Sequence, residues 1–211
     1  MRTNDITSFP DVIIPLFHVD SFQRNMKFVS GGFIPSGEDG KWCGKGMYFW
    51  DNLSNVKYWV RDKQRKNPKI TVDVAKSSLI CSQNDILDLT DEETSIQMKL
   101  AAISYAKKYG VTINIKNNGN VINFIHDVIC RENAITSPDK KQSIFSVVKV
   151  AGYYKNINKE GLVASNESYK KSSATATAHM RLIYAVREST LLQKRKVINL
   201  AEEEIPNDLS F

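Results

Sequence analysis

The sequence predicts one α+β domain that spans residues 1–211. Strand-like segments gather toward both ends of the chain and helix-like segments lie between them, unlike the regular alternation of a doubly wound sheet. The length of 211 residues suits a single domain. The content of 42% hydrophobic and 25% charged residues is typical of a globular protein with a sizeable core, which excludes general disorder.

The first strand is expected over Val12–His18, an apolar run rich in β-branched residues. Pairing is predicted to begin after Pro15, because proline cannot donate to a strand ladder. A short helix should follow over Phe22–Val29 and end at the two glycines after it. The proline- and glycine-containing stretch Phe33–Trp42 predicts a loop.

A second strand is expected over Gly46–Trp50 and a helix over Leu53–Lys63, with Asp51-Asn52 as its N-cap. Two further short strands are predicted at Ile70–Val74 and Ser78–Cys81.

A long helix is predicted to follow a capping box formed by Thr90 and Glu93, and to end near Tyr109 before Gly110. Its apolar residues recur at helical spacing, so its buried face is expected to carry Ile96, Leu100 and Ile103. The remaining elements are a helix at Val121–Ile129 and strands at Ile144–Tyr154, Leu182–Val186 and, more weakly, Val197–Leu200. Turns or loops are expected at 117–120, 133–142, 156–161 and 172–178, and the tail from 201 is expected to fray.

The net charge of +6 favours association with phosphates, and therefore with nucleic acid. The basic residues are densest at 61–66, 170–171 and 194–196. A solvated surface that keeps the protein soluble is the competing interpretation.

The three cysteines, Cys43, Cys81 and Cys130, are odd in number and widely spaced, so they predict reduced thiols and no disulfide framework. Structural zinc needs four ligands, and no metal site is expected. The first residues lack a secretory pattern, and no apolar run is long enough to span a bilayer. We therefore expect a cytoplasmic protein without a membrane partner.

The chemistry-bearing residues lie in the first half of the chain. A strand ends at Phe17-His18, a helix and a loop follow, and the segment Gly44-Lys45-Gly46-Met47-Tyr48-Phe49 precedes another helix. This order resembles the catalytic domain of the poly(ADP-ribose) polymerase and diphtheria-toxin branch of the ADP-ribosyltransferases. The likeness extends to Leu87–Asp91 (LDLTD) and Ala178–Glu188, and runs from about Leu16 to about Val197.

The resemblance implies an ADP-ribosyltransferase-like fold, in which two small packed β-sheets form an NAD cleft with flanking helices. His18 would hydrogen-bond a ribose hydroxyl, the backbone of Val19 would hold the carboxamide, and the Tyr48 ring would stack on nicotinamide. Two glycines, Gly44 and Gly46, would let the backbone approach the ligand. We therefore expect NAD to be bound by His18, Val19, Gly44, Gly46, Tyr48 and Phe49, with Tyr58 as a second stacking tyrosine.

The sequence departs from this family on its late strand. The family usually carries a Glu or Gln there, whereas Met180–Val186 has neither, and the position falls on Arg181 or Ile183. Arg181 is the polar alternative, and with His18 and Tyr48 it completes the expected catalytic set. Glu188 and His179 are further polar candidates near the same strand, whereas His126 reads as a structural histidine.

The resemblance implies a mono-ADP-ribosyltransferase, of the intracellular bacterial toxin or phage-defence type, that uses NAD and no metal. The acceptor would be a macromolecule, with RNA or DNA favoured by the basic charge. A protein acceptor, or a catalytically degenerate module that binds NAD or ADP-ribose, is the alternative, as is an NAD glycohydrolase or RNA 2′-phosphotransferase on a related fold. A toxin of this kind would be restrained by an antitoxin protein.

Overall fold

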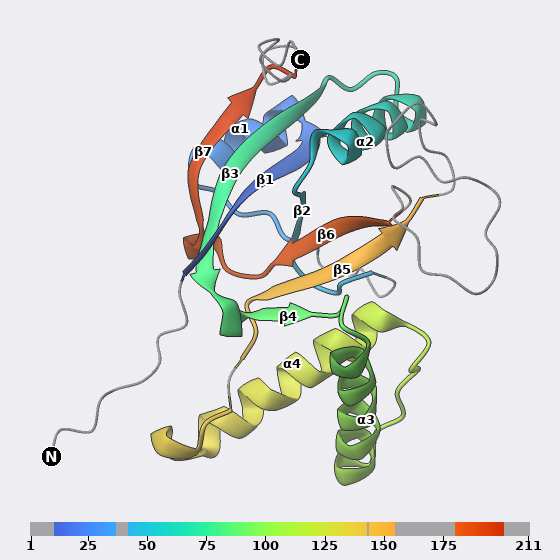
Figure 1. Cartoon of the computed structure of the whole chain (residues 1–211), viewed down its shortest axis with the longest axis vertical. Coiled ribbons are helices and arrows are strands. Elements are labelled where there is room, and N and C mark those ends of the chain that lie inside the picture. Colours follow the sequence, from blue (N-terminus) through green and yellow to red (C-terminus); the bar gives the residue numbers. More distant parts are fainter. Residues whose placement is uncertain (1–10, 37–41, 143, 155–179, 201–211) are drawn as a thin grey trace, which may run out of the picture.

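The computed structural model describes residues 11–36, 42–142, 144–154 and 180–200. Among these residues, seven strands form one sheet in the order β4-β5-β6-β2-β1-β3-β7, with four α-helices around it (Figure 1). The predicted α+β class is confirmed. The strands are β1 (Asp11–Ser21), β2 (Met47–Trp50), β3 (Val72–Ser82), β4 (Ile86–Asp88), β5 (Val147–Tyr153), β6 (Met180–Val186) and β7 (Leu192–Ile198). The helices are α1 (Phe22–Val29), α2 (Leu53–Lys66), α3 (Glu92–Tyr109) and α4 (Asn118–Ile135).

The expectation of two separate packed sheets is wrong, because the strands are joined into a single hydrogen-bonded sheet. The joint is narrow, since β1 and β2 share one register pair, Phe17 opposite Trp50. By contrast, β1 pairs with β3 along its whole length and β2 pairs with β6 along its whole length. The strands β1, β3 and β7 consequently run in a clearly different direction from β5 and β6 (Figure 1).

Strand pairing also corrects two predictions from local sequence. β1 pairs with β3 from Asp11 onward, and Pro15 lies opposite Ser78 inside the ladder. At this position β1 is hydrogen-bonded to β3 on one side and to no strand on the other. Proline is tolerated there because its missing amide hydrogen can lie on the side without a partner strand. The two short strands predicted over 70–81 are one strand, since Lys76 and Ser77 keep their register with β1.

The core lies on both faces of the sheet, because side chains of β1 alternate between them. Leu16 packs with Phe28 of α1 and Phe49 of β2 on one face. Phe17 and Val19 pack with Val56 of α2 on the other. His18 shares the α1 face, where its ring lies 5.4 Å from the ring of Phe49.

The long helix α3 ends as predicted, with Gly110 in the left-handed conformation at φ 63°. The predicted capping box is wrong, because the side chain of Asp91 accepts from the amide of Thr94 while Thr90 bonds to Asp88.

The predicted buried face of α3 is also wrong. Ile96, Leu100 and Ile103 are 51%, 59% and 45% exposed. Two alanines, Ala102 and Ala106, are buried instead, because α3 packs closely against α4, and small side chains permit such an approach. The apolar residues of α3 therefore mark an outward face.

The other boundaries shift by a few residues. α4 begins at Asn118, inside the predicted turn at 117–120, and it continues to Ile135. β7 begins at Leu192, because this residue pairs with Leu79 of β3. The loops predicted at 156–161 and 172–178, and the tail from 201, lie outside the described residues. Within the described residues, no helix combines the length and the apolar character needed to cross a membrane.

Arg195 of β7 is a structural residue, although the sequence placed it in a basic surface group. Its guanidinium donates to the carbonyl oxygens of Phe28, Gly32, Ser189 and Leu192 at 2.6–3.2 Å. It also lies over the Phe28 ring, 4.6 Å from the centroid. The side chain therefore fixes the end of α1 to the far edge of the sheet.

We predict that Arg195→Met lowers the free energy of unfolding by about 2–4 kcal/mol, because four carbonyl groups lose their donor. Arg195→Lys should recover only part of the loss, since an ammonium cannot reproduce the planar fork. Urea unfolding measures both changes. Gln193→Met, an exposed substitution on the same strand, is the control and should change the stability by less than about 0.5 kcal/mol. Equal stability of Arg195→Met and the control would contradict the structural role.

Candidate functional site

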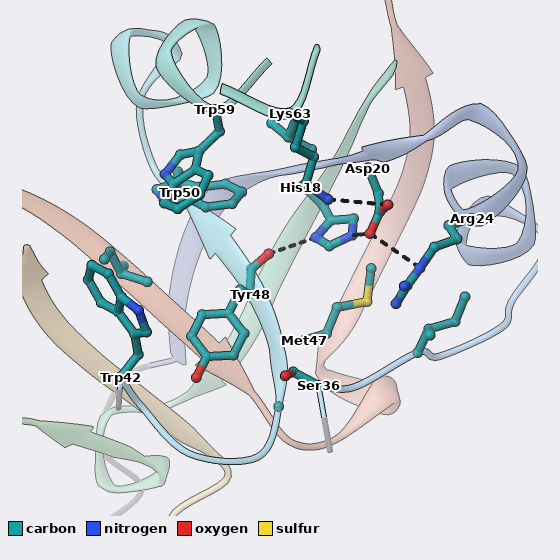
Figure 2. Close-up of a pocket in the computed structure, with 14 residues that line it drawn as sticks. His18, Asp20, Arg24, Ser36, Trp42, Met47, Tyr48, Trp50, Trp59 and Lys63 are labelled. Carbon is teal, nitrogen blue, oxygen red and sulfur yellow. Dashed lines mark hydrogen bonds and ion pairs between the residues drawn. The ribbon is translucent and has the colours of Figure 1, made fainter. Parts of the chain in front are cut away.

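A pocket of about 210 Å³ lies where the two halves of the sheet meet at β1 and β2 (Figure 2). Side chains of both strands, of α1 and α2, and of the segment before β2 contribute to it. The lining includes His18, Val19, Asp20, Arg24, Ser36, Trp42, Gly46, Met47, Tyr48, Trp50, Trp59, Lys63 and Ile183. The structure therefore brings four of the predicted residues, His18, Val19, Gly46 and Tyr48, to one pocket.

His18 is held in place at both ring nitrogens. Its Nδ1 donates to the backbone carbonyl oxygen of Tyr48 at 2.7 Å, since a carbonyl oxygen only accepts. Its Nε2 lies 3.5 Å from a carboxylate oxygen of Asp20. The side chain is 10% exposed, so the ring is a fixed part of the pocket wall.

Asp20 is the centre of a charged cluster. Besides His18, its carboxylate contacts Arg24 Nε of α1 at 3.2 Å and Lys63 Nζ of α2 at 3.2 Å (Figure 2). Burial opposes the charged form of Asp20, but the His18 hydrogen bond and the charge of Lys63 outweigh it and hold the pKa of Asp20 well below its usual value. The carboxylate is 13% exposed, whereas Arg24 and Lys63 are 49% and 30% exposed. The cations thus stand between the carboxylate and the solvent.

Tyr48 places its ring in the pocket and uses its hydroxyl to fix the preceding loop. The hydroxyl donates to the Gly44 carbonyl at 2.8 Å and accepts from the Cys43 amide at 3.1 Å. The backbone carbonyl of the same residue holds His18. One tyrosine therefore sets both the loop conformation and the orientation of the histidine.

The two glycines of this loop have different roles. Gly46 lines the pocket with φ 152°, and a Cβ there would press against Val186 and Ala185 of β6. Gly44 has φ 75° and faces α4, where a Cβ would collide with the side chain of Asn123. The expected cofactor contact of Gly44 therefore has no counterpart in the pocket lining.

Tryptophans form the aromatic wall where a second tyrosine was expected. Trp50 and Trp59 line the pocket with ring centroids 5.3 Å apart, and Trp42 lies beside the Tyr48 ring (Figure 2). Tyr58 points elsewhere and packs edge-on against Tyr154 at 5.1 Å. Helical geometry explains the difference, because neighbouring residues of α2 point in directions about 100° apart. Phe49 is fully buried in the core behind His18.

On the late strand, Ile183 lines the pocket opposite Trp50, and Arg181 does not. Arg181 instead donates to the Ser54 carbonyl and the Asn55 side chain, both at 3.2 Å, and lies over the Tyr154 ring. The register places it beyond the end of β2, beside the first turn of α2. Glu188 accepts from the Ser146 hydroxyl at 2.8 Å and is not among the lining residues.

Sequence reasoning missed Asp20, Arg24 and Lys63. One signal was present, because Asp20 follows His18 by two residues on a strand and must share its face. Arg24 follows Asp20 by four residues, the spacing of a helical ion pair. Lys63 comes from another element, and no local pattern pairs it with β1.

The remaining histidine and cysteines have structural surroundings. His126 packs edge-on against Phe145 at 5.3 Å, and burial followed by the charge of Arg187 lowers its pKa. The three cysteines are free thiols. In the part of the chain that the structure describes, no group of three or more His, Cys, Asp or Glu side chains could hold a metal ion. His179 lies outside the described residues.

Comparison with known proteins gives no match: no protein-family model, no curated protein and no solved structure is similar to this chain. The case for a function therefore depends on the residues of the pocket and their chemistry.

We predict that Asp20→Asn lowers the free energy of unfolding near pH 7 by on the order of 2 kcal/mol. A carboxylate with a lowered pKa stabilises the fold above its unfolded pKa of about 3.8 and loses this effect as the pH falls toward its folded pKa. The difference between wild type and variant should therefore shrink from about pH 5 to about pH 2. Urea unfolding across this range measures it.

Asp73→Asn is the matched control, because Asp73 lies on the neighbouring strand directly opposite Asp20. If the difference in free energy of unfolding between wild type and Asp20→Asn stays constant with pH, this would contradict the ionic role of the carboxylate.

Proposed function

We propose that this chain is an NAD-dependent mono-ADP-ribosyltransferase that binds the nicotinamide end of NAD in the His18–Tyr48 pocket. The observation that carries the proposal is the placement of two motif segments, distant in sequence, in one pocket. His18 of β1 and Gly46-Met47-Tyr48 of β2 line it together, and the Tyr48 carbonyl orients the histidine. These are the segments that carry the resemblance to ADP-ribosyltransferases.

The aromatic side of the pocket suits a flat ring. Tyr48, Trp50 and Trp59 present ring surfaces to it, and stacking between aromatic planes contributes about 1 kcal/mol beyond the area buried. Nicotinamide in NAD is a cationic ring, and the electron-rich faces of Trp and Tyr attract such a cation. These groups could hold the ring while its bond to ribose breaks.

The opposite side of the pocket suits a phosphate. Arg24 contacts Asp20 through Nε at 3.2 Å, and its side chain is 49% exposed. The guanidinium projects toward Met47 at the edge of the pocket (Figure 2). Arg24 and Lys63 together place two cationic side chains beside the single carboxylate of Asp20 on this side of the pocket. A dinucleotide could place its nicotinamide ring against the tryptophans and its diphosphate near Arg24, so that each end of the pocket meets a group of suitable chemistry.

The reaction requires little covalent chemistry from the protein. The bond between the nicotinamide nitrogen and ribose C1′ breaks, nicotinamide leaves as a neutral ring, and an acceptor nucleophile bonds to C1′ and loses its proton. Fixing the two reactants in line supplies much of the acceleration. His18 is placed to hold a ribose hydroxyl through Nε2, because Nδ1 fixes the ring on the Tyr48 carbonyl, whereas the 3.5 Å between Nε2 and Asp20 is longer than an ordinary hydrogen bond.

We propose nucleic acid as the acceptor, on the strength of charge beside the pocket. The second half of α2 carries Arg61, Arg65 and Lys66 on the helix whose Lys63 lines the pocket. Arg65 and Lys66 both pair with Asp62 at 2.8 and 2.6 Å, yet they remain 77% and 65% exposed. A basic surface next to the reacting centre would attract a phosphate backbone.

Binding of NAD or ADP-ribose without transfer is the second candidate, and one observation favours it. Among the described residues, neither Glu nor Gln lines the pocket, and the carboxylate that does, Asp20, is engaged by three cationic or polar partners. Ile183 occupies the strand position opposite Trp50. Measured binding without release of nicotinamide would select this function.

We predict that the protein binds NAD and releases nicotinamide when cell RNA, DNA or protein is added. His18→Ala should lower the rate at least about a hundredfold, because it removes a fixed positioning group. Tyr48→Ala should act similarly through loss of the stacking ring, whereas Tyr48→Phe keeps the ring and should cost about tenfold or less. Labelled NAD, followed by RNase, DNase or protease digestion, identifies the acceptor.

The matched control is His126→Ala, which removes a histidine outside the pocket and should leave both readouts within about twofold of wild type. Absence of NAD binding by calorimetry would sink the proposal. Label that resists both nucleases and yields to protease would overturn the nucleic acid acceptor alone.

We predict that Arg24→Met weakens NAD binding by about three- to tenfold, the range of a half-exposed ionic contact of roughly 1 kcal/mol. The same change should leave binding of nicotinamide riboside, which lacks the diphosphate, unaltered. Calorimetry or NMR titration with the two ligands separates these outcomes. Lys27→Met, an exposed cation on the same helix that does not line the pocket, is the control. Equal loss for both ligands would rule out a phosphate contact.

A further inference from the structure

An exposed apolar stripe runs along α3 at the opposite end of the molecule from α1 and α2 (Figure 1). It consists of Ile96, Leu100 and Ile103, each at least 45% exposed. Their spacing places all three on one side of the helix, away from the alanines that pack on α4. Three large aliphatic side chains side by side on a surface mark an interaction site.

A charged residue lies at each end of this stripe, and the two charges have opposite signs. Glu92 in the first turn of α3 and Lys107 in the last turn lie on the same side as the three apolar residues. Both are exposed, and neither forms an ion pair with another described residue. The neighbouring Lys108, by contrast, is paired with Glu132. The stripe and its two end charges form what we call the α3 face: Glu92, Ile96, Leu100, Ile103 and Lys107.

The α3 face is complementary to itself when one copy is reversed. Its midpoint lies between Lys99 and Leu100. Ile96 and Ile103 lie at equal separations on either side of this midpoint, and so do Glu92 and Lys107. Two antiparallel α3 helices related by a two-fold axis would therefore set Ile96 of each against Ile103 of the other. The same axis would set each Glu92 against the Lys107 of the other copy, with the two Leu100 side chains at the centre.

We infer that the α3 face is a self-association surface, through which two copies of this chain form an antiparallel two-fold dimer. In this arrangement apolar residues meet apolar residues and acids meet bases over about 22 Å of helix, at 1.5 Å per residue. This match favours a second copy of the chain as the binding partner of the α3 face. Packing of two helices at 8–10 Å would cover the aliphatic side chains and leave the charges at the rim. The inference is independent of the function proposed for the pocket.

The dimer is expected to be weak, with a dissociation constant in roughly the micromolar range, because one helix from each copy gives a small interface. Sedimentation equilibrium of the full chain at increasing concentration should show conversion of monomer to dimer. Leu100→Lys should raise the dissociation constant at least about tenfold, since it places two like charges at the centre. Ile135→Lys, on an exposed isoleucine of α4 outside the α3 face, should leave it within about twofold.

Charge reversal tests the antiparallel geometry. Glu92→Lys alone and Lys107→Glu alone each place like charges together and should weaken the dimer by about three- to tenfold. The double variant Glu92→Lys/Lys107→Glu restores opposite charges at both ends and should recover most of the affinity. Circular dichroism and thermal unfolding of each variant confirm that α3 is intact, because both reversals oppose the helix dipole.

Cysteine cross-linking gives a second, direct test in a Cys130→Ser background. A mixture of Ile96→Cys and Ile103→Cys chains should form an intermolecular disulfide. Each variant alone should not, because identical positions would be about 10 Å apart along the helices, beyond disulfide reach. A monomer at all concentrations, a dimer unaffected by Leu100→Lys, or a double charge reversal without recovery would overturn the inference.

Discussion

The narrow junction between β1 and β2 is the constraint on which the rest of the structure depends. Only Phe17 and Trp50 are in register there, while each strand is fully paired on its other side. A sheet joined so loosely can change direction at that point, and its two halves diverge (Figure 1). The pocket lies in this divergence, and its lining comes from both halves.

The pocket is chemically polarised across this junction. Tryptophans and Tyr48 occupy one side, and the Asp20 cluster occupies the side nearer α1, where Lys63 reaches it from α2 (Figure 2). His18 lies at the boundary, held by a carbonyl on one side and a carboxylate on the other. Such a preorganised ring needs no rearrangement when a ligand arrives, which is the property that positioning catalysis requires. The same polarity fits an elongated ligand with a flat head and an anionic tail.

Sequence reasoning succeeded where the information was local. The strand that carries His18 and the strand of Tyr48 after Gly46 could be predicted, because short-range pattern determines both, although β1 continues past the predicted end to Ser21. Sequence reasoning failed where the environment of a residue depended on contacts with residues distant in the sequence. The apolar spacing of α3 indicated a face but not whether this chain covers it, and Ile96 proved exposed. The choice between Arg181 and Ile183 depended on register with Trp50, and Lys63 meets Asp20 only through packing of α2 on β1.

The tight approach of Gly44 to Asn123 has a genetic consequence. The Asn123 side chain accepts from the Lys45 amide at 2.8 Å and from Arg187 at 2.9 Å, and it fills the space that a Cβ at Gly44 would need. The loop before β2 and the helix α4 are thus in direct steric contact. Position 44 is consequently expected to accept only glycine, because its φ of 75° strains any side chain and a Cβ would lie 2.8 Å from the Gly119 carbonyl oxygen even if residue 123 were smaller. In a library of variants, a smaller residue at position 123 should therefore not rescue a substitution of Gly44.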